Sequence, residues 1–424
     1  MANASAVSRF VVFSFGFLWV LSLALSSLSS KAMGLAWLLM VLTGLWAGVR
    51  SLRSGQSLHT PEWVRMWLGV CTLVLILKSV PMLYWSDPWA ERHGELRLIL
   101  GALAIYALVA SDLKMRPRLL SQLAYALSLS SLMGLIWVSV YDRDAVTTHP
   151  IPWAGGMAMV SACLLAMGLK SDYGPRARRL WLIGGLLAVL AILASRSRGA
   201  FGIVIWWMLV CGHHFWRHRF HASDKPLWQD IGRRYRSVMA AVVILMAGGW
   251  ALSYTPVLQR PFSAVQEAVT QLEVSSASAS AGANSSVGSR IFMWQHSLMA
   301  IQDSPWIGYG RDGRKQLLNQ WADEAHSEEI HRLGHVHNEY LNQLIDHGLW
   351  GLASQLCLLL GLVWLCWALV RAQETTAALA LSGVTFVHFT ASFFNVNFAH
   401  NYYTASLSTL IGLCLWMPRL RARA

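Results

Sequence analysis

The sequence predicts an all-α polytopic membrane protein, and three observations support this fold class. Of 424 residues, 55% are apolar and only 13% are Asp, Glu, Lys or Arg, about half the charge of an ordinary soluble domain. Uncharged runs at 11–30 and 238–255 have roughly the 20 residues that a helix needs to cross a bilayer. These runs lack the strict alternation of barrel strands, and lipid admits only helices or closed barrels.

Hydropathy divides the chain into about twelve spans. The first is read as a retained anchor rather than a signal peptide, because the second span follows at once. The six cysteines all lie inside apolar runs, so no disulfide framework is predicted. The expected spans are residues 10–30, 32–49, 64–85, 96–111, 119–141, 152–170, 179–195, 199–216, 238–255, 349–370, 376–394 and 402–417.

Three regions follow from this division: residues 1–255 with nine spans, a large loop at 256–348, and residues 349–424 with the last three spans and a tail. With the N-terminus inside, most Lys and Arg residues outside the large loop fall in inner segments, as the positive-inside rule requires. The net charge of +13 is therefore explained by topology rather than by nucleic-acid binding. Both termini are expected on the cytoplasmic side and the loop outside.

The large loop contains short predicted helices. One possible amphipathic helix covers about 264–274, and a Ser/Ala/Gly/Asn stretch at 275–288 is too poor in apolar groups to fold alone. Apolar residues then recur at helical spacing from Ile291 to Ile301, through Trp294 and Leu298, which predicts a helix lying in the membrane interface.

The end of the loop is predicted from helix stop and start signals. Asp303-Ser304-Pro305 ends the interfacial helix, and Gly308 and Gly310 shape a turn. A second helix is expected to start near Asn338, with its apolar stripe running through Tyr340, Leu341, Leu344 and Ile345.

Arginines on the outer side are the first candidates for binding a substrate. Arg196 and Arg198 occupy the tight turn between the seventh and eighth spans, against the positive-inside bias. Guanidinium groups bind phosphate oxygens bidentately, and a helix starting at Gly199 adds free N–H groups. Arg290, which heads the interfacial helix, is the second candidate. The alternatives are interfacial snorkelling for the turn and a solvated loop charge for Arg290.

Two histidines, His335 and His337, precede the predicted helix start at Asn338. An imidazole with an ordinary pKa of about 6.5 accepts a proton from a hydroxyl at neutral pH, which makes His337 a candidate general base. Two alternatives remain open. The pair could be plain loop histidines, or a His-x-His metal pair, for which no third ligand is obvious.

Two further features carry charge near the outer face. Asp142 and Asp144 flank Arg143 in an outer turn; such carboxylates can hold a divalent cation on a diphosphate, but a solvated turn is favoured. Lys78 stands in the third span with no acidic partner nearby in the sequence. An intramembrane lysine is a functional candidate, with snorkelling as its alternative.

Together these features favour an enzyme that handles an anionic lipid at the membrane surface. Arginines suit a lipid-linked diphosphate, which needs no acid as a leaving group once its charge is neutralised, and a histidine can activate an attacking hydroxyl. This chemistry is glycosyl transfer from a polyprenyl diphosphate carrier. A carrier-lipid or glycan transporter is the non-enzyme alternative, but it should show polar residues deep in several spans, and only Lys78 stands out.

Three stretches of the sequence resemble the O-antigen ligase and polymerase superfamily of bacterial envelope enzymes. Residues 195–199 (Ser-Arg-Ser-Arg-Gly) resemble the Ser-Arg-Gly turn of the family. Arg290 to Trp294, followed by residues 303–310, resembles the Arg and Trp segment before its Asp-x-Pro-x-x-Gly-x-Gly turn. Residues 337–341 and 348–352 resemble its His-Asn-x-x-Leu and Gly-x-x-Gly-Leu block.

The resemblance implies a GT-C-like fold with a periplasmic helical loop, in the bacterial inner membrane, and a metal-independent, inverting transferase without a cofactor. It implies that Arg198 and Arg290, and less surely Arg196, bind the diphosphate of an undecaprenyl-linked glycan. His337 would be the base, and Asn338 would orient it or cap the helix. His335 and Lys78 complete the substrate-binding candidates.

Members of the superfamily differ in their acceptor. One dominant loop and about 420 residues look most like an O-antigen ligase, which uses lipid A–core as acceptor. Polymerases and protein-glycosylating relatives are the alternatives.

Overall fold

The computed structural model describes residues 16–55, 60–111, 119–141, 144, 146, 148–170, 173–221 and 283–421. Within these ranges every regular element is a helix, which confirms the all-α class. Seven of the described helices are long and apolar enough to cross a membrane, and two shorter apolar stretches, Gly202–His213 and Thr375–Ala391, join them. The chain is a multi-pass membrane protein.

The bundle helices match most of the predicted spans to within a few residues. The span expected at 10–30 is helical over 16–24; the span at 238–255 and the helix at 264–274 lie outside the described residues. The helices are α2 (Ser30–Arg53), α3 (Glu62–Tyr84), α4 (His93–Ala110), α5 (Leu119–Tyr141), α6 (Pro150–Lys170), α7 (Pro175–Ala194), α8 (Gly202–His221), α16 (Glu339–Arg371), α17 (Thr375–Ala391) and α18 (Asn401–Arg421).

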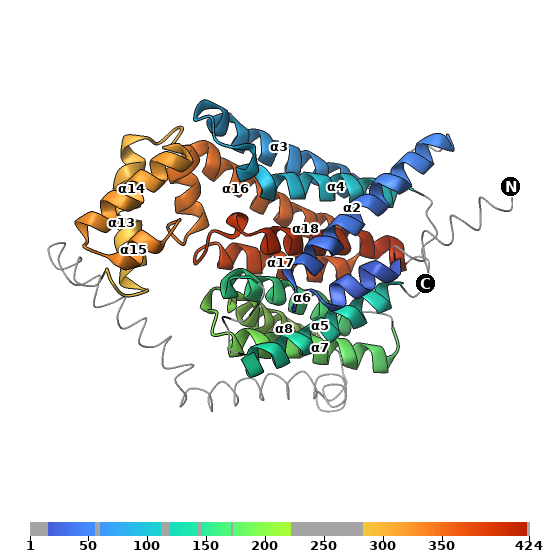
Figure 1. Cartoon of the computed structure of the whole chain (residues 1–424). Helices are drawn as coiled ribbons and strands as arrows, with labels where there is room; N and C mark the ends of the chain where they lie inside the picture. Colours follow the sequence, from blue (N-terminus) through green and yellow to red (C-terminus); the bar gives the residue numbers. More distant parts are fainter. Residues whose placement is uncertain are drawn as a thin grey trace.

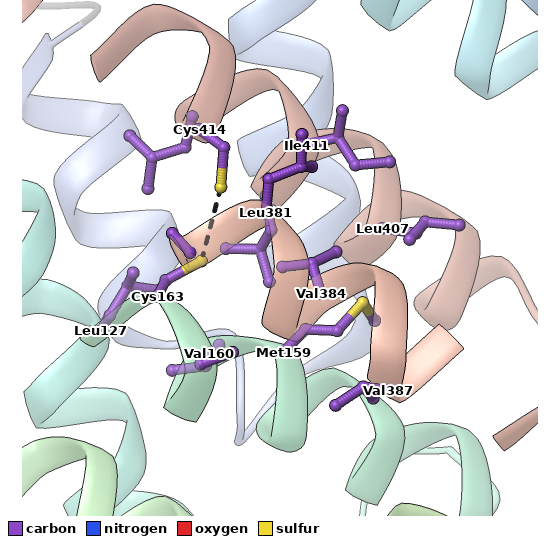
Figure 2. Packing of buried hydrophobic residues seen from close by; sticks show 14 of the residues in the cluster. Leu127, Met159, Val160, Cys163, Leu381, Val384, Val387, Leu407, Ile411 and Cys414 are labelled. Carbon is purple, nitrogen blue, oxygen red and sulfur yellow. Dashed lines mark hydrogen bonds between the residues drawn. The ribbon is translucent and has the colours of Figure 1, made fainter. Parts of the chain in front are cut away.

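Helix α6 is the centre of the bundle, because 94% of its most apolar 18-residue stretch is buried. Its small residues allow close helix contacts, as is common in membrane bundles. At Gly155 and Gly156 an added Cβ would meet the rings of Tyr403 and Tyr402 of α18 at less than 3 Å. Figure 2 shows the same interface further along, where the sulfurs of Cys163 and Cys414 are 3.9 Å apart. All six cysteines are free thiols.

Three helices of the large loop form a small separate unit, which we call the loop unit: α13 (Gly288–Asp303), α14 (Gly310–Glu324) and α15 (Glu328–Arg332). It lies at one end of the elongated bundle (Figure 1). The helix predicted over 291–301 is present as α13, but its buried face is offset from the predicted stripe. Phe292 and Met293 enter the core of the loop unit, whereas Leu298 is 56% exposed.

Helices α14 and α15 were not predicted from the sequence. Both are dominated by polar residues, and their few apolar side chains, such as Trp321 and Ile330, are buried in the core of the loop unit. Such helices lack a long apolar stripe of their own and are stabilised by packing.

Two interlocked bends join the loop unit to α16. The turn after α13 passes through Gly308 with a φ of 70°, and α16 is broken at Gly348 with a φ of 59°. Tyr309 N–H donates to the Ile345 carbonyl (2.7 Å), and Leu349 N–H donates to the Pro305 carbonyl (2.8 Å). The two glycines thus allow two bends of the chain to pair through their backbones.

The loop unit defines one end of the bundle, which we call the loop end. It also contains the α3–α4 turn, the start of α6, the α7–α8 turn and the α17–α18 turn. Trp85 of the α3–α4 turn donates its indole N–H to the Ile307 carbonyl (3.3 Å). At the opposite end the Arg178 side chain donates to the carbonyls of Gly168 (2.9 Å) and Leu169 (3.2 Å) and so caps α6.

Candidate active site

The chain around His337 is held from both sides. On one side the Trp294 indole N–H of α13 donates to the Val336 carbonyl (2.8 Å). On the other side Glu339 N–H, at the start of α16, donates to the Ser392 carbonyl at the end of α17 (2.8 Å). His337 itself has a φ of 54°, a left-handed conformation that is uncommon outside glycine. Surrounding contacts therefore fix the position of this residue between the loop unit and the bundle.

Asn338 caps helix α16. Its side-chain Oδ1 accepts a hydrogen bond from Leu341 N–H (3.1 Å), which satisfies one of the free N–H groups at the helix start. The predicted helix start is therefore found one residue later, at Glu339. The Asn338 side chain faces its own helix, so its observed contact is the cap.

Four histidines gather at the loop end. The rings of His335 and His337 lie edge to face with centroids 4.4 Å apart. The backbone N–H of His337 donates to the ring nitrogen Nδ1 of His335 (3.3 Å). The ring of His400, from the α17–α18 turn, is 6.2 Å from His335. The ring of His149, just before α6, is stacked on His400 at 6.1 Å. Neither His400 nor His149 was predicted from the sequence as a site residue.

Burial keeps three histidines of this cluster neutral, namely His337, His335 and His400. It lowers the pKa of His337 to about 2, with further lowering by His335 and by the positive charge of Arg290. It lowers the pKa of His335 to about 3 and that of His400 to about 4, where neighbouring histidines add to the effect. At neutral pH each ring therefore carries one proton and offers one lone pair.

One buried nitrogen of His337 has no hydrogen-bond partner among the described residues. The side chain is only 7% exposed, and among the described residues nothing hydrogen-bonds its buried Nδ1. Buried polar atoms normally have a partner, so an orphan atom here requires an explanation. One such explanation is a hydrogen bond that this nitrogen accepts from the hydroxyl of a bound substrate.

Arg290 lies close enough to His337 for its charge to affect the imidazole. It is the third residue of α13, and the neighbouring Ser289, Phe292 and Met293 are buried and hold this end of the helix in the loop unit. The side chain therefore stands at a helix N-terminus, where backbone N–H groups add to its attraction for anions.

The turn with Arg196 and Arg198 lies at the loop end. The Ser197 hydroxyl donates to the Pro150 carbonyl at the start of α6 (3.2 Å), next to His149. Arg196 is exposed and has a φ of 55°. Arg198 begins the short helix η3 (Arg198–Ala200); the position of its side chain lies outside the description. The structure thus brings the backbone of this turn to the same end as His337.

Lys78 differs from the sequence expectation, because it has an acidic partner. Its Nζ lies 2.7 Å from Glu95 Oε1, and both side chains are buried. Glu95 follows 17 residues later, in the first turn of α4, and meets Lys78 only because α3 and α4 pack side by side. Snorkelling is therefore excluded for this lysine. It lines a cavity together with His335.

The carboxylate pair in the turn after α5 is only partly described. Asp142 lies outside the described residues, and Asp144 is exposed. Within the described part of the chain, no group of three His, Cys, Asp or Glu side chains is arranged to hold a metal ion.

Comparisons with known proteins match part of this chain to one family and to two curated relatives. The family described as O-antigen ligase matches residues 183–356, a range with all three arginine candidates, His337 and the paired glycine bends. A General O-oligosaccharyltransferase of Acinetobacter baylyi is 27% identical over 203 residues, 47% of this chain and 31% of that protein. An uncharacterized protein of Haemophilus influenzae is 26% identical over 183 residues, 42% of each chain.

These alignments span less than half the length of either curated relative. They nevertheless agree with the family match in kind, because one of the two relatives is named as a glycan transferase. The similarity to the O-antigen ligase family covers residues 183–356 of this chain.

Proposed function

We propose that the protein is an O-antigen ligase. It transfers a glycan from undecaprenyl diphosphate to a sugar hydroxyl of lipid A–core, without a metal and with inversion at the anomeric carbon. His337 is the general base, Arg290 and Arg198 bind the diphosphate, and Arg196 contributes charge at the rim of the site.

The observation that carries this proposal is the state of His337. The imidazole is neutral, buried, and has an Nδ1 that no described residue hydrogen-bonds, with the charge of Arg290 in range. A proton acceptor beside a cation matches the needs of an attacking hydroxyl and an anionic leaving group.

The low pKa of His337 fits a site that is completed by its donor. A base with a pKa of about 2 is weak, because its proton affinity is low. A bound diphosphate brings negative charge next to the ring and offsets the positive charge of Arg290, which raises the pKa toward neutral. Donor binding thus strengthens the base at the point when it is needed.

The proposed step forms one bond and breaks another at the anomeric carbon of the donor. The acceptor oxygen forms a bond to the anomeric carbon while the bond from that carbon to the diphosphate oxygen breaks, and the electron pair leaves with the diphosphate. The hydroxyl proton passes to His337, and attack from the face opposite the leaving group inverts the configuration. The arginines stabilise the anion that departs, so the leaving group needs no acid.

The loop end is proposed to face the periplasm, with the membrane being the bacterial inner membrane and both termini cytoplasmic. The support is the bias of basic residues toward the segments at the opposite end, of which the Arg178 cap on α6 is one example. A lipid-linked donor reaches such a site from the outer leaflet.

A protein acceptor is the second candidate, because one relative is named General O-oligosaccharyltransferase. The test supplies purified protein in vesicles with a carrier-linked glycan and either core lipid or an acceptor protein. We expect core lipid to be modified, with equal rates before and after addition of EDTA. Modification of the protein alone would replace the ligase assignment. Movement of an unaltered carrier lipid across the vesicle would instead identify a transporter.

A further inference from the structure

A cavity at the loop end has His335, the neighbour of His337, in its wall. It has a volume of about 100 Å³ and forms where the α3–α4 turn, α14 and the start of α16 meet. Its walls include Lys78, Arg314, Asn342, Asp346, His335 and Gly334. A cavity of this size has room for several water molecules, so it can also hold part of a polar ligand.

The charges that line this cavity are paired with one another. Lys78 is paired with Glu95, Arg311 Nε lies 3.2 Å from Glu91 Oε1, and Arg314 forms an ion pair with Asp346. Because each of these cations already has a carboxylate, the cavity offers little net positive charge to a diphosphate. It differs in this respect from the surroundings of Arg290 and His337.

Several buried polar atoms of the cavity walls remain without partners. Arg314, Asn342 and Asp346 are each nine-tenths or more buried. Within the described ranges, Arg314 Nε, Asn342 Oδ1 and Asp346 Oδ1 have no hydrogen-bond partner. One of these atoms is a donor and two are acceptors. A buried polar group without a partner destabilises the protein, so a ligand or water that satisfies this set is favoured.

The mixture of donor and acceptors selects the chemistry of the ligand. Phosphate oxygens at neutral pH chiefly accept hydrogen bonds and would be repelled by two bare acceptors. Sugar hydroxyls both donate and accept, so neighbouring hydroxyls of one ring can meet all three atoms.

The cavity is connected to the proposed base through His335. His335 is part of its wall, and the ring of His335 lies 4.4 Å from that of His337. Because His335 Nδ1 accepts from the backbone of His337 and the ring is neutral, its proton lies on Nε2. His335 thus supplies a further donor between the cavity and the proposed base.

We propose that this cavity is the subsite for a sugar ring of the acceptor, next to the hydroxyl that is glycosylated. The inference rests on the proposed ligase function and adds the place where the acceptor is held. Donor and acceptor then approach His337 from two sides, the diphosphate beside Arg290 and the acceptor sugar past His335.

Gly334 offers a direct way to block the cavity without altering the rest of the protein. It is exposed, its φ is outside the left-handed region, and an added Cβ would meet nothing within 4 Å. We expect Gly334→Leu to raise the KM for core lipid roughly tenfold or more while the KM for the carrier-linked donor stays unchanged. Gly69→Leu is the matched control. Gly69 is also exposed, an added Cβ there would meet nothing within 4 Å, and it lies in the first half of α3, well before the cavity-lining Lys78.

Two results of this kinetic experiment overturn the inference. A rise in donor KM with unchanged acceptor KM would assign the cavity to the donor. Equal acceptor KM values for Gly334→Leu, Gly69→Leu and the unaltered protein would exclude a sugar subsite here.

A binding measurement separates this inference from the proposed function. Lipid-free core oligosaccharide, titrated by calorimetry, is expected to bind the unaltered protein and Gly69→Leu but to bind Gly334→Leu at least tenfold more weakly. Equal binding to all three proteins contradicts the subsite. An unaltered protein that binds the oligosaccharide but transfers no glycan to core lipid would contradict the ligase function while leaving the sugar site in place.

Discussion

Burial and neighbouring charge act together on His337. A histidine in water would be partly protonated near pH 6.5, but here burial, His335 and Arg290 lower its pKa to about 2. The ring is therefore neutral over the physiological range and keeps a free lone pair on one nitrogen. The same neutrality makes the folded protein sensitive to acid, because the unfolded chain protonates its histidines first.

The folded protein is predicted to lose stability as the pH falls. His335, His337 and His400 have folded pKa values of about 3, 2 and 4, below the unfolded value of about 6.5. Between these values the unfolded state binds more protons, so stability falls as the pH falls below about 6.5, by up to about 1.4 kcal/mol per pH unit for each histidine. Thermal unfolding in detergent at several pH values measures this loss.

A variant isolates the contribution of one histidine from that of the carboxylates. His400→Gln removes a titrating group at the edge of the cluster, so its Tm should fall less steeply between pH 6.5 and 4 than that of the unaltered protein. Parallel Tm curves for the two proteins would show that His400 keeps an ordinary pKa.

Arg290 is predicted to act on the donor. Arg290→Ala should weaken binding of the carrier diphosphate by about 2–5 kcal/mol, as expected when one partner of a desolvated charge pair is removed. The measurement is the Kd of the purified protein for the carrier-linked donor. Arg332→Ala serves as the control, because Arg332 is exposed in the same loop unit and its ion-pair partner among the described residues is Glu328. Equal Kd values for the two variants would remove Arg290 from the donor site.

At the level of the helices and turns, the structure explains why glycine is needed at positions 308 and 348. Gly308 and Gly348 both have φ values in the left-handed region, which favours glycine. Each lies against the backbone of the other bend: a Cβ on Gly308 would be 2.4 Å from the Ile345 carbonyl oxygen, and one on Gly348 would be 2.3 Å from the Trp306 carbonyl carbon. This contact sets the angle between the loop unit and α16, and with it the position of His337.

Gly348→Ala is therefore predicted to destabilise the junction. The added methyl group meets backbone atoms that have little freedom to move, and a left-handed φ adds strain, together costing about 1–3 kcal/mol or more. Thermal unfolding should show a lower Tm, and transfer activity should fall with it. Gly69→Ala is the control, since its Cβ meets nothing within 4 Å and alanine favours a helix. A Tm for Gly348→Ala equal to that of the control would show that the bend is not constrained.

At the scale of the whole molecule, hydropathy and charge determine which end of each helix faces which side. The α3–α4, α7–α8 and α17–α18 turns and the start of α6 converge with the loop unit, as alternating spans require. The functional residues come from segments far apart in the sequence and meet only because these helix ends share one face of the bundle.

Labelling tests this arrangement. Gln302→Cys, in the loop unit, should react with a membrane-impermeant thiol reagent on intact cells, whereas Ala372→Cys, between α16 and α17, should react only after the inner membrane is opened. Both positions are exposed, and the six native thiols lie in apolar helices, so background labelling should be low. Reaction of Ala372→Cys on intact cells would reverse the proposed topology.

The sequence predicts local features of this protein better than its contacts. The end of α13 at Asp303 and the start of α16 after Asn338 follow from a proline and an Asn cap, which are signals within a few residues. The pairing of Lys78 with Glu95 and the meeting of His335 with His400 depend on helix packing that no local pattern encodes. Helices α14 and α15 escaped prediction because their apolar residues are few and find their partners only in the loop unit.

Proton transfer by His337 is tested most directly by single-turnover transfer in a His337→Asn variant with saturating donor. Asparagine tolerates the left-handed backbone of this position but does not act as a base, so folding should be retained. We predict that donor binding stays within a few-fold of normal while transfer falls by about two to four orders of magnitude, and that His331→Gln, an exposed control in α15, behaves normally. Transfer near the normal rate by a donor-binding His337→Asn protein would contradict the account.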